Sequence, residues 1–184
     1  MPDSLIVEYC SPTLAGIKTA NLFSYEYENK SEVYAEVARL SRLLARKGLK
    51  ALVAGFKKGR ALVYIYRPAY LMRDIRSDKA RRVLESLGYR TDDCDACVRR
   101  MLRHLRDDEA FPHEIGFFLG YPPEDVIGFM KNKAEKPKYT GYWKVYGDVK
   151  SAIDTFDRYK KCTDSYEKQL STGKTLEDLV VECG

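Results

Sequence analysis

The 184-residue sequence predicts an α+β fold in which a small antiparallel sheet packs among five to seven helices. The main evidence for the sheet is a pair of short apolar segments, 49–56 and 61–67, which flank a turn that contains Gly59. This pattern predicts a β-hairpin over about residues 49–67. Several other segments place apolar residues at helical spacing. A segment rich in aromatic and β-branched residues, 140–146, is a candidate third strand.

Two helices are predicted before the hairpin. Ser11 and Pro12 favour the start of the first, because serine caps helices and proline suits their first turn. Ser31 is expected to cap the second. Its apolar residues recur at helical spacing over 33–44, and Gly48 is placed to end it.

Two further helices are predicted directly after the hairpin. Ser77 is expected to cap a short helix that ends at Gly88. Asp92 or Asp93 caps the next one. Over residues 94–105 its apolar side chains recur at i, i+3, i+4, i+7, i+8 and i+11, which predicts one buried face.

The last third of the chain predicts three more helices. Pro112 and Pro123 each open a short one, because proline is favoured in the first turn. Asp148 caps a final long helix. No linker or internal repeat divides the chain. We therefore expect a single α+β domain over residues 5–170 and a C-terminal tail over residues 171–184.

Charge is distributed unevenly along the chain. Residues 39–106 carry nineteen basic and six acidic side chains, a net charge of +13, whereas the whole chain carries +5. One interpretation is an anionic partner, such as nucleic acid, a phosphorylated metabolite or an anionic cofactor. The other is a set of solvated helix faces that pair with the acidic ends of the same chain.

The five cysteines are Cys10, Cys94, Cys97, Cys162 and Cys183. Cys94 and Cys97 have the CxxC spacing of dithiol redox motifs at a helix start, where the helix dipole lowers a thiol pKa. However, no strand leads into the motif, and a zinc site would need two more ligands. Because both residues fall on the apolar face, we expect them to be reduced and mostly buried. Cys10 is a candidate nucleophile beside a helix start.

His113 and Glu114 are adjacent candidates for acid–base chemistry. Histidine titrates near neutral pH, and glutamate can orient it or act as a base. Neighbouring residues of a helix point about 100° apart, so these two cannot form a catalytic pair by themselves. The alternative for Glu114 is a favourable interaction with the helix dipole.

Several enzyme classes are disfavoured because their motifs are missing. The sequence has no Walker loop, no glycine-rich dinucleotide motif after a strand, no HExxH and no nucleophile elbow. No apolar segment approaches the ~20 residues of a membrane-spanning helix. The first residues also lack the basic start of a secretory signal. We expect a cytoplasmic protein without a membrane partner.

Four stretches together resemble a known bacterial family, DUF3793, which occurs mostly in anaerobes. They are 10–23 (CSPTLAGIKTANLF), 59–68 (GRALVYIYRP), 111–129 (FPHEIGFFLGYPPEDVIGF) and 141–147 (GYWKVYG). The resemblance covers roughly residues 5–166 and implies a single cytoplasmic domain. It brings no established activity, cofactor or catalytic residue. Members often carry cysteines near the last stretch, where this chain has tyrosines instead.

These stretches also contain polar residues typical of exposed sites, and we expect them to converge on one cleft beside the sheet. Lys18, Arg67 and Lys144 would neutralise an anionic ligand. Rings that interleave with basic residues, as they do around residue 143, can stack on a planar ligand. The residues expected to bind ligand are Lys18, Asn21, Arg67, Tyr121, Trp143, Lys144 and Tyr146.

The leading hypothesis is therefore a domain that binds a small anionic or planar ligand. Any enzymatic step would use one of the three catalytic candidates, Cys10, His113 or Glu114. One alternative is a nucleic-acid-binding module that uses the basic block 39–106. Another is a haem or metal handling protein with Cys, His and Tyr ligands. The sequence points to no particular cofactor and to no metal site.

Overall fold

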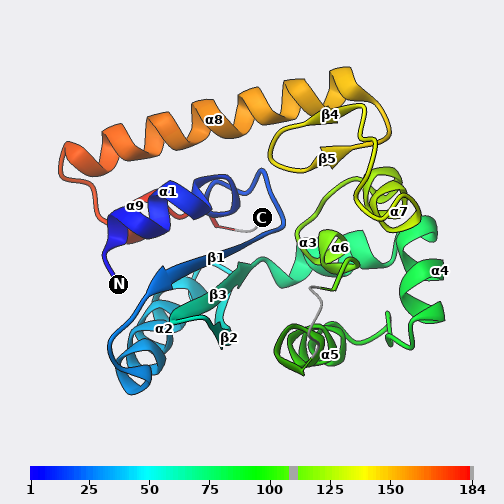
Figure 1. Ribbon diagram of the computed structural model, residues 1–184. Coiled ribbons are helices and arrows are strands. Elements are labelled where there is room, and N and C mark those ends of the chain that lie inside the picture. Colours follow the sequence, from blue (N-terminus) through cyan, green and yellow to red (C-terminus); the bar gives the residue numbers. More distant parts are fainter. Residues whose placement is uncertain (108–111, 183–184) are drawn as a thin grey trace. The chain divides into compact units, whose positions relative to one another are not determined.

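The computed structural model describes residues 1–107 and 112–182, and its fold is α+β, as predicted (Figure 1). Phe111 and Cys183 of the sequence analysis lie outside the described residues. The chain forms two compact units. Unit 1 contains Met1–Pro68 and Lys161–Gly184, and unit 2 contains Ala69–Lys160. The division into one domain and a tail stays a prediction.

Unit 1 is built on a three-stranded antiparallel sheet in the order β1-β3-β2. Its elements are α1 (Asp3–Leu14), β1 (Ala20–Glu26), α2 (Lys30–Ala45), β2 (Lys50–Lys57), β3 (Arg60–Tyr66) and α9 (Leu176–Leu179), together with the end of α8 (Val149–Ser171). Strands β2 and β3 confirm the predicted hairpin. Lys58 and Gly59 form its two-residue turn, and both have positive φ, which matches the right-handed twist of the strands.

One face of this sheet forms the core of unit 1. Phe23, Val63 and Ile65 lie on it and pack with buried side chains of α1, α2 and α9. Leu176 and Leu179 of α9 belong to this cluster, so the C-terminal segment is part of the core. Each such fully buried side chain contributes about 1.5–3 kcal/mol relative to an exposed one.

The first helix differs from the prediction. It begins at Asp3, and Pro12 lies in its last turn. Ile6, Cys10 and Leu14, which follow one another at i, i+4 and i+8, are fully buried on one face. Proline at position 12 removes one helical hydrogen bond, to the carbonyl of the exposed Glu8, and water can replace it there.

Strand β1 was not predicted, because the helical interpretation was extended through Asn21. Its residues alternate between the two sheet faces, with Leu22 opposite Tyr64 and Phe23 opposite Val63. The segment predicted as a third strand, 140–146, instead forms a separate two-stranded hairpin in unit 2. Helix α2 is capped by Asn29 rather than by Ser31, whose amide donates to the Asn29 side chain at 2.9 Å.

Unit 2 is mainly helical. Its elements are α3 (Pro68–Ile75, whose first residue belongs to unit 1), α4 (Asp78–Ser86), α5 (Cys94–Asp107), α6 (Ile115–Phe118), α7 (Pro123–Lys131), β4 (Tyr139–Thr140), β5 (Lys144–Val145) and the start of α8. Asp93 and Asp148 accept amide hydrogen bonds at the starts of α5 and α8, as predicted. Ser77 precedes α4, but its hydroxyl donates to the carbonyl of Asp74 at 2.8 Å and caps no amide of the helix. Helix α3 was not predicted.

Two glycines of unit 2 allow rings to approach the backbone closely. A Cβ atom at Gly128, in α7, would collide with Tyr146. A Cβ atom at Gly141, in the turn between β4 and β5, would collide with the ring of Phe156 in α8. Both glycines therefore set how closely the β4–β5 hairpin packs against the helices.

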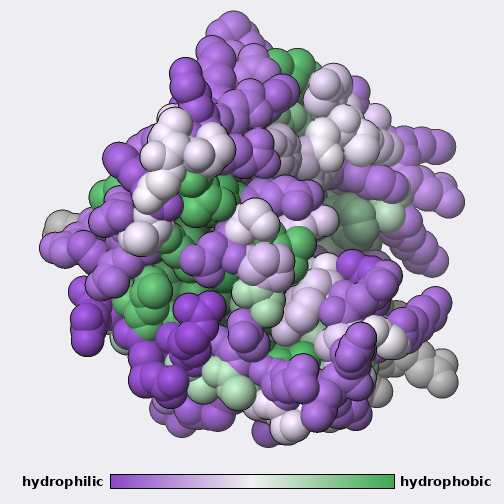
Figure 2. All heavy atoms as spheres, turned by 90° about the vertical axis from the view of Figure 1, so that its left-hand side faces the viewer, coloured by the Kyte–Doolittle hydropathy of each residue, from purple (hydrophilic) through white to green (hydrophobic). Residues whose placement is uncertain are grey.

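No helix in the described part of the chain is long and apolar enough to cross a membrane. On the face seen in Figure 2, hydrophilic side chains predominate, and apolar ones are visible between them.

Candidate functional site

Arg67, a predicted ligand residue, is fully buried in unit 1. Its Nε donates to the carbonyl of Thr13 at 2.7 Å, and its Nη2 donates to those of Leu14 at 2.8 Å and Val181 at 2.7 Å. The last carbonyls of a helix have no partner within the helix and carry the negative end of its dipole. Arg67 therefore stabilises the C-terminus of α1.

Lys18 is 6% exposed, and its amine donates to the carbonyl of Ala20. Burial lowers the pKa of Lys18 to about 7, against a smaller opposing effect of Cys10. Burial raises the pKa of the Cys10 thiol far above its ordinary value. Since the thiolate is the nucleophile, these surroundings do not favour Cys10 as a catalytic residue.

Asn21 lies at the start of β1 and accepts a hydrogen bond from Thr13 at 2.6 Å. It thus joins β1 to the end of α1. The predicted residues of unit 1 all make contacts within the fold, and their roles toward a ligand stay predictions.

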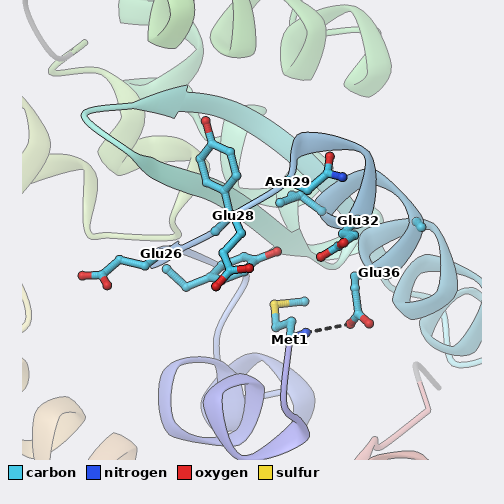
Figure 3. A pocket seen from close by; sticks show the side chains of 10 residues that line it. Met1, Glu26, Glu28, Asn29, Glu32 and Glu36 are labelled. Atoms are coloured by element: carbon cyan, nitrogen blue, oxygen red, sulfur yellow. Dashed lines mark hydrogen bonds and ion pairs between the residues drawn. The ribbon is translucent and has the colours of Figure 1, made fainter.

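Unit 1 also contains a cavity of about 400 Å³ where β1 leads into α2 (Figure 3). The Met1 ammonium and Glu36 form an ion pair in it at 2.9 Å. The carboxylate of Glu26 points away from the other acidic side chains and pairs with Arg60 at 3.0 Å. The lining residues are Met1, Tyr25, Glu26, Tyr27, Glu28, Asn29, Glu32, Val33, Ala35 and Glu36. This lining favours cations over anions and contains none of the predicted site residues.

In unit 2, Trp143 is the centre of an aromatic cluster. Its ring stacks on Tyr121 at 4.8 Å and meets Phe156 edge-on at 4.5 Å. The indole nitrogen donates to Asp125 Oδ2 at 2.7 Å. Asp125 Oδ1 accepts from the amides of Tyr146 and Gly147, so this buried carboxylate fixes the segment after β5.

A groove of about 330 Å³ opens beside this cluster. Trp143 forms part of its wall, and α7 and α8 supply the sides. The lining residues are Pro122, Glu124, Asp125, Trp143, Gly147, Asp148, Ser151, Ala152 and Thr155. Glu124 and Asp148 are exposed carboxylates, and the groove has no basic side chain among these residues.

Lys144 and Tyr146 contact the loop that follows α7. The Lys144 amine donates to the carbonyl of Ala134 at 2.7 Å, and the Tyr146 hydroxyl donates to that of Glu135 at 3.1 Å. Ala134 has positive φ, as do Lys133 and Lys136 in the same loop. These two predicted ligand residues therefore stabilise an unusual loop conformation.

His113 and Glu114 have different surroundings. His113 is exposed, with its ring 5.1 Å from that of Phe129. Glu114 is buried, and its Oε1 accepts from the Tyr89 hydroxyl at 2.9 Å and lies 3.0 Å from Nδ1 of His104. The sequence analysis missed both partners. His104 follows Met101 at i+3 in α5, and this position beside the apolar stripe was the available signal.

The charges in this cluster are set by its contacts. Burial alone would raise the pKa of the Glu114 carboxyl, but hydrogen bonds from His104, the backbone and Tyr89 hold it below its usual value. Burial, together with the charge of Glu114, raises the pKa of the Tyr89 hydroxyl far above its usual value. Glu114 is therefore an anion at neutral pH, and Tyr89 is a hydrogen-bond donor.

The CxxC cysteines lie at the start of α5, and both are reduced. Cys97 is buried, and its thiol donates to the carbonyl of Arg90 at 3.0 Å. Burial raises the pKa of Cys97 to about 11. This shift is opposite to that of a reactive redox thiol. Among the described residues, no group of three or more His, Cys, Asp or Glu side chains could hold a metal ion.

The arginines of α5 do not all face solvent. Arg99, Arg103 and Arg106 are exposed. Arg100 instead donates to the carbonyl of Leu87 at 2.8 Å and lies over the ring of Tyr89, 5.3 Å from its centre.

Comparisons with known proteins agree with the resemblance seen in the sequence. A family model described as "Protein of unknown function (DUF3793)" matches residues 6–180, nearly the whole chain. Comparisons with curated proteins and with solved structures gave no match.

Proposed function

The chain belongs to the DUF3793 family, whose description assigns no activity, and we propose from its own residues that it binds a small planar ligand in the groove beside Trp143. The observation that carries this proposal is the Trp143 ring, the one aromatic side chain among the residues that line the groove. Tyr121 and Phe156 hold the Trp143 ring in place, so ordering it for a ligand costs little entropy. We further propose that the protein works in the cytoplasm.

The charge of the groove narrows the ligand class. Glu124 and Asp148 are its exposed charged groups, and both are acidic; Glu124 pairs with Lys79, so Asp148 is the carboxylate that a ligand would meet first. Asp125 already accepts three hydrogen bonds from the protein. The best candidates are therefore a planar cation and a neutral heterocycle rich in hydrogen-bond donors, rather than the anion considered first.

Two rings of similar size and opposite charge test this assignment. 1-Methylnicotinamide, methylated on the ring nitrogen, is a planar cation, and nicotinate is a planar anion at neutral pH. We expect saturable binding of the cation by calorimetry, together with a higher melting temperature. Trp143 is the only tryptophan of the chain, so its fluorescence should change with the same saturation curve. Equal binding of both probes, or binding of neither, would contradict the proposal.

A pair of variants controls for effects away from the groove. Ser151→Gln places a longer side chain in the groove, whereas Asp157→Gln changes an exposed position of α8 outside it. Ser151→Gln should weaken cation binding, and Asp157→Gln should leave it unchanged. Both positions are exposed, so neither change should unfold the protein.

Nucleic-acid binding is a second candidate, favoured by the exposed row of Arg99, Arg103 and Arg106 on α5. Neutralised phosphates release counterions, so the affinity for a labelled oligonucleotide should fall steeply with salt. The double change Arg99→Glu and Arg103→Glu should abolish this binding. The matched reversal of Lys161 and Lys168, both exposed on α8, should not. Salt-independent or undetectable binding would remove this candidate.

A further inference from the structure

The cluster of Tyr89, His104 and Glu114 has a geometry that the proposed ligand groove does not use. The three side chains come from the segment after α4, from α5 and from the residue before α6. Glu114 Oε1 is the shared acceptor, 2.9 Å from the Tyr89 hydroxyl and 3.0 Å from His104 Nδ1. Glu114 and Tyr89 are at most 10% exposed, whereas the His104 side chain is 26% exposed.

This arrangement selects one tautomer of His104. A carboxylate can only accept, so it favours a proton on Nδ1. The Tyr89 hydroxyl uses its single proton toward Glu114 and cannot supply one to the imidazole as well. In the neutral ring the lone pair then lies on Nε2. A carboxylate that holds the other nitrogen fixes the tautomer and the orientation of the ring.

One cationic side chain, Arg100, lies against the cluster. Arg100 precedes His104 by one helical turn on the same side of α5, and its guanidinium lies against the Tyr89 ring. Guanidinium groups bind phosphate through paired N–H donors, so the surroundings favour an anionic reaction partner with phosphoryl oxygens.

We propose that Nε2 of His104 accepts a phosphoryl group from a small phosphoryl donor, such as an acyl phosphate or a phosphoramidate. With phosphoramidate, the Nε2 lone pair forms the new N–P bond, the P–N bond of the donor breaks, and its electron pair leaves on ammonia. The ring keeps its Nδ1 proton and becomes an imidazolium. Glu114 acts as a positioning residue, because its carboxylate stabilises this positive charge.

The two histidines of the chain make the test internally controlled. The folded protein is incubated with phosphoramidate, and both sites are followed by mass spectrometry and phosphorus NMR. We expect His104 to react faster than His113, although His113 is more exposed, and to give only the Nε2 isomer. Labelling of His104 no faster than His113, or formation of the Nδ1 isomer at His104, would overturn the proposal.

Variants separate this role from a structural one. Glu114→Gln should slow labelling of His104 by about tenfold and leave His113 unchanged. Tyr89→Phe keeps the carboxylate and should preserve the isomer and most of the rate. Circular dichroism shows whether each variant is folded. If Glu114→Gln unfolds, the rate ratio and isomer in the unaltered protein still decide the question. If the groove beside Trp143 proves to bind no ligand, the expected labelling of His104 does not change.

Discussion

Arg67 and Val181 lie 114 positions apart in the sequence, and Nη2 of the arginine donates to the carbonyl of Val181 at 2.7 Å. The same nitrogen donates to the carbonyl of Leu14, and this Leu14 carbonyl also accepts a hydrogen bond from the amide of Val181 at 3.0 Å. Three segments of unit 1 therefore meet at one buried charge: the end of β3, the end of α1 and the segment after α9.

We expect Arg67→Ala to reduce the free energy of unfolding by ~3 kcal/mol or more, because it removes three hydrogen bonds made by a buried charged group and leaves a cavity in its place. Urea unfolding followed by circular dichroism measures the change. Arg42→Ala, at an exposed position of α2, is the control and should cost less than about 0.5 kcal/mol. A loss of less than about 1 kcal/mol for Arg67→Ala would show that the carbonyls find other donors.

Asp125→Asn should destabilise unit 2 by about 2–3 kcal/mol. An amide can accept from the backbone N–H groups of Tyr146 and Gly147, but its NH₂ group then opposes the indole N–H of Trp143. The change should also alter the fluorescence of Trp143. Asp157→Asn, at an exposed site, should change neither quantity. Unaltered fluorescence in Asp125→Asn would contradict the assigned hydrogen bond.

Glu114 should contribute stability that depends on pH. Its pKa is lower in the folded protein than in the unfolded chain, so its contribution is present above the unfolded value of 4.5. As the pH falls through the lowered folded pKa, protonation removes it. Glu114→Gln should therefore be less stable than the parent at neutral pH, and the difference should shrink in acid. A difference independent of pH would rule out this linkage.

The thiols should react with iodoacetamide in an order set by burial. Cys10 and Cys97 are fully buried, and burial raises the pKa of both, so we expect them to react only after unfolding. Cys94 is half-exposed and should react earlier. Peptide mapping of the native protein measures the order. Rapid native labelling of Cys97 would contradict its buried position.

The sequence predicted elements whose signals are local. The hairpin follows from a turn that needs positive φ at Gly59, and Asp93 and Asp148 cap their helices through their own side chains. The predicted start of α1 was wrong because Ser11 and Pro12 fit a helix start as well as they fit the last turn, where they lie. The helix begins earlier because Ile6 and the other buried residues of α1 pack in the core against the sheet, which is a tertiary effect.

The candidate site was less predictable. Tyr121 and Trp143 were expected as ring contacts, and they stack on each other. A lysine or arginine that binds a ligand has the same local sequence as one that binds a backbone carbonyl, and Arg67 makes the second kind of contact. The partners of Glu114 are ten and twenty-five positions away, and only the fold brings them together.

Gly128 and Gly141 restrict the residues that relatives of this chain can carry at these positions. Each glycine faces a ring that occupies the space of its absent side chain, Tyr146 in one case and Phe156 in the other. A relative with alanine at position 141 must therefore carry a smaller residue at position 156. Alanine at position 128 would instead meet the Cβ atom of residue 146, which a smaller side chain at that position still has. Positions 141 and 156 should therefore covary across the family, whereas position 128 should stay glycine.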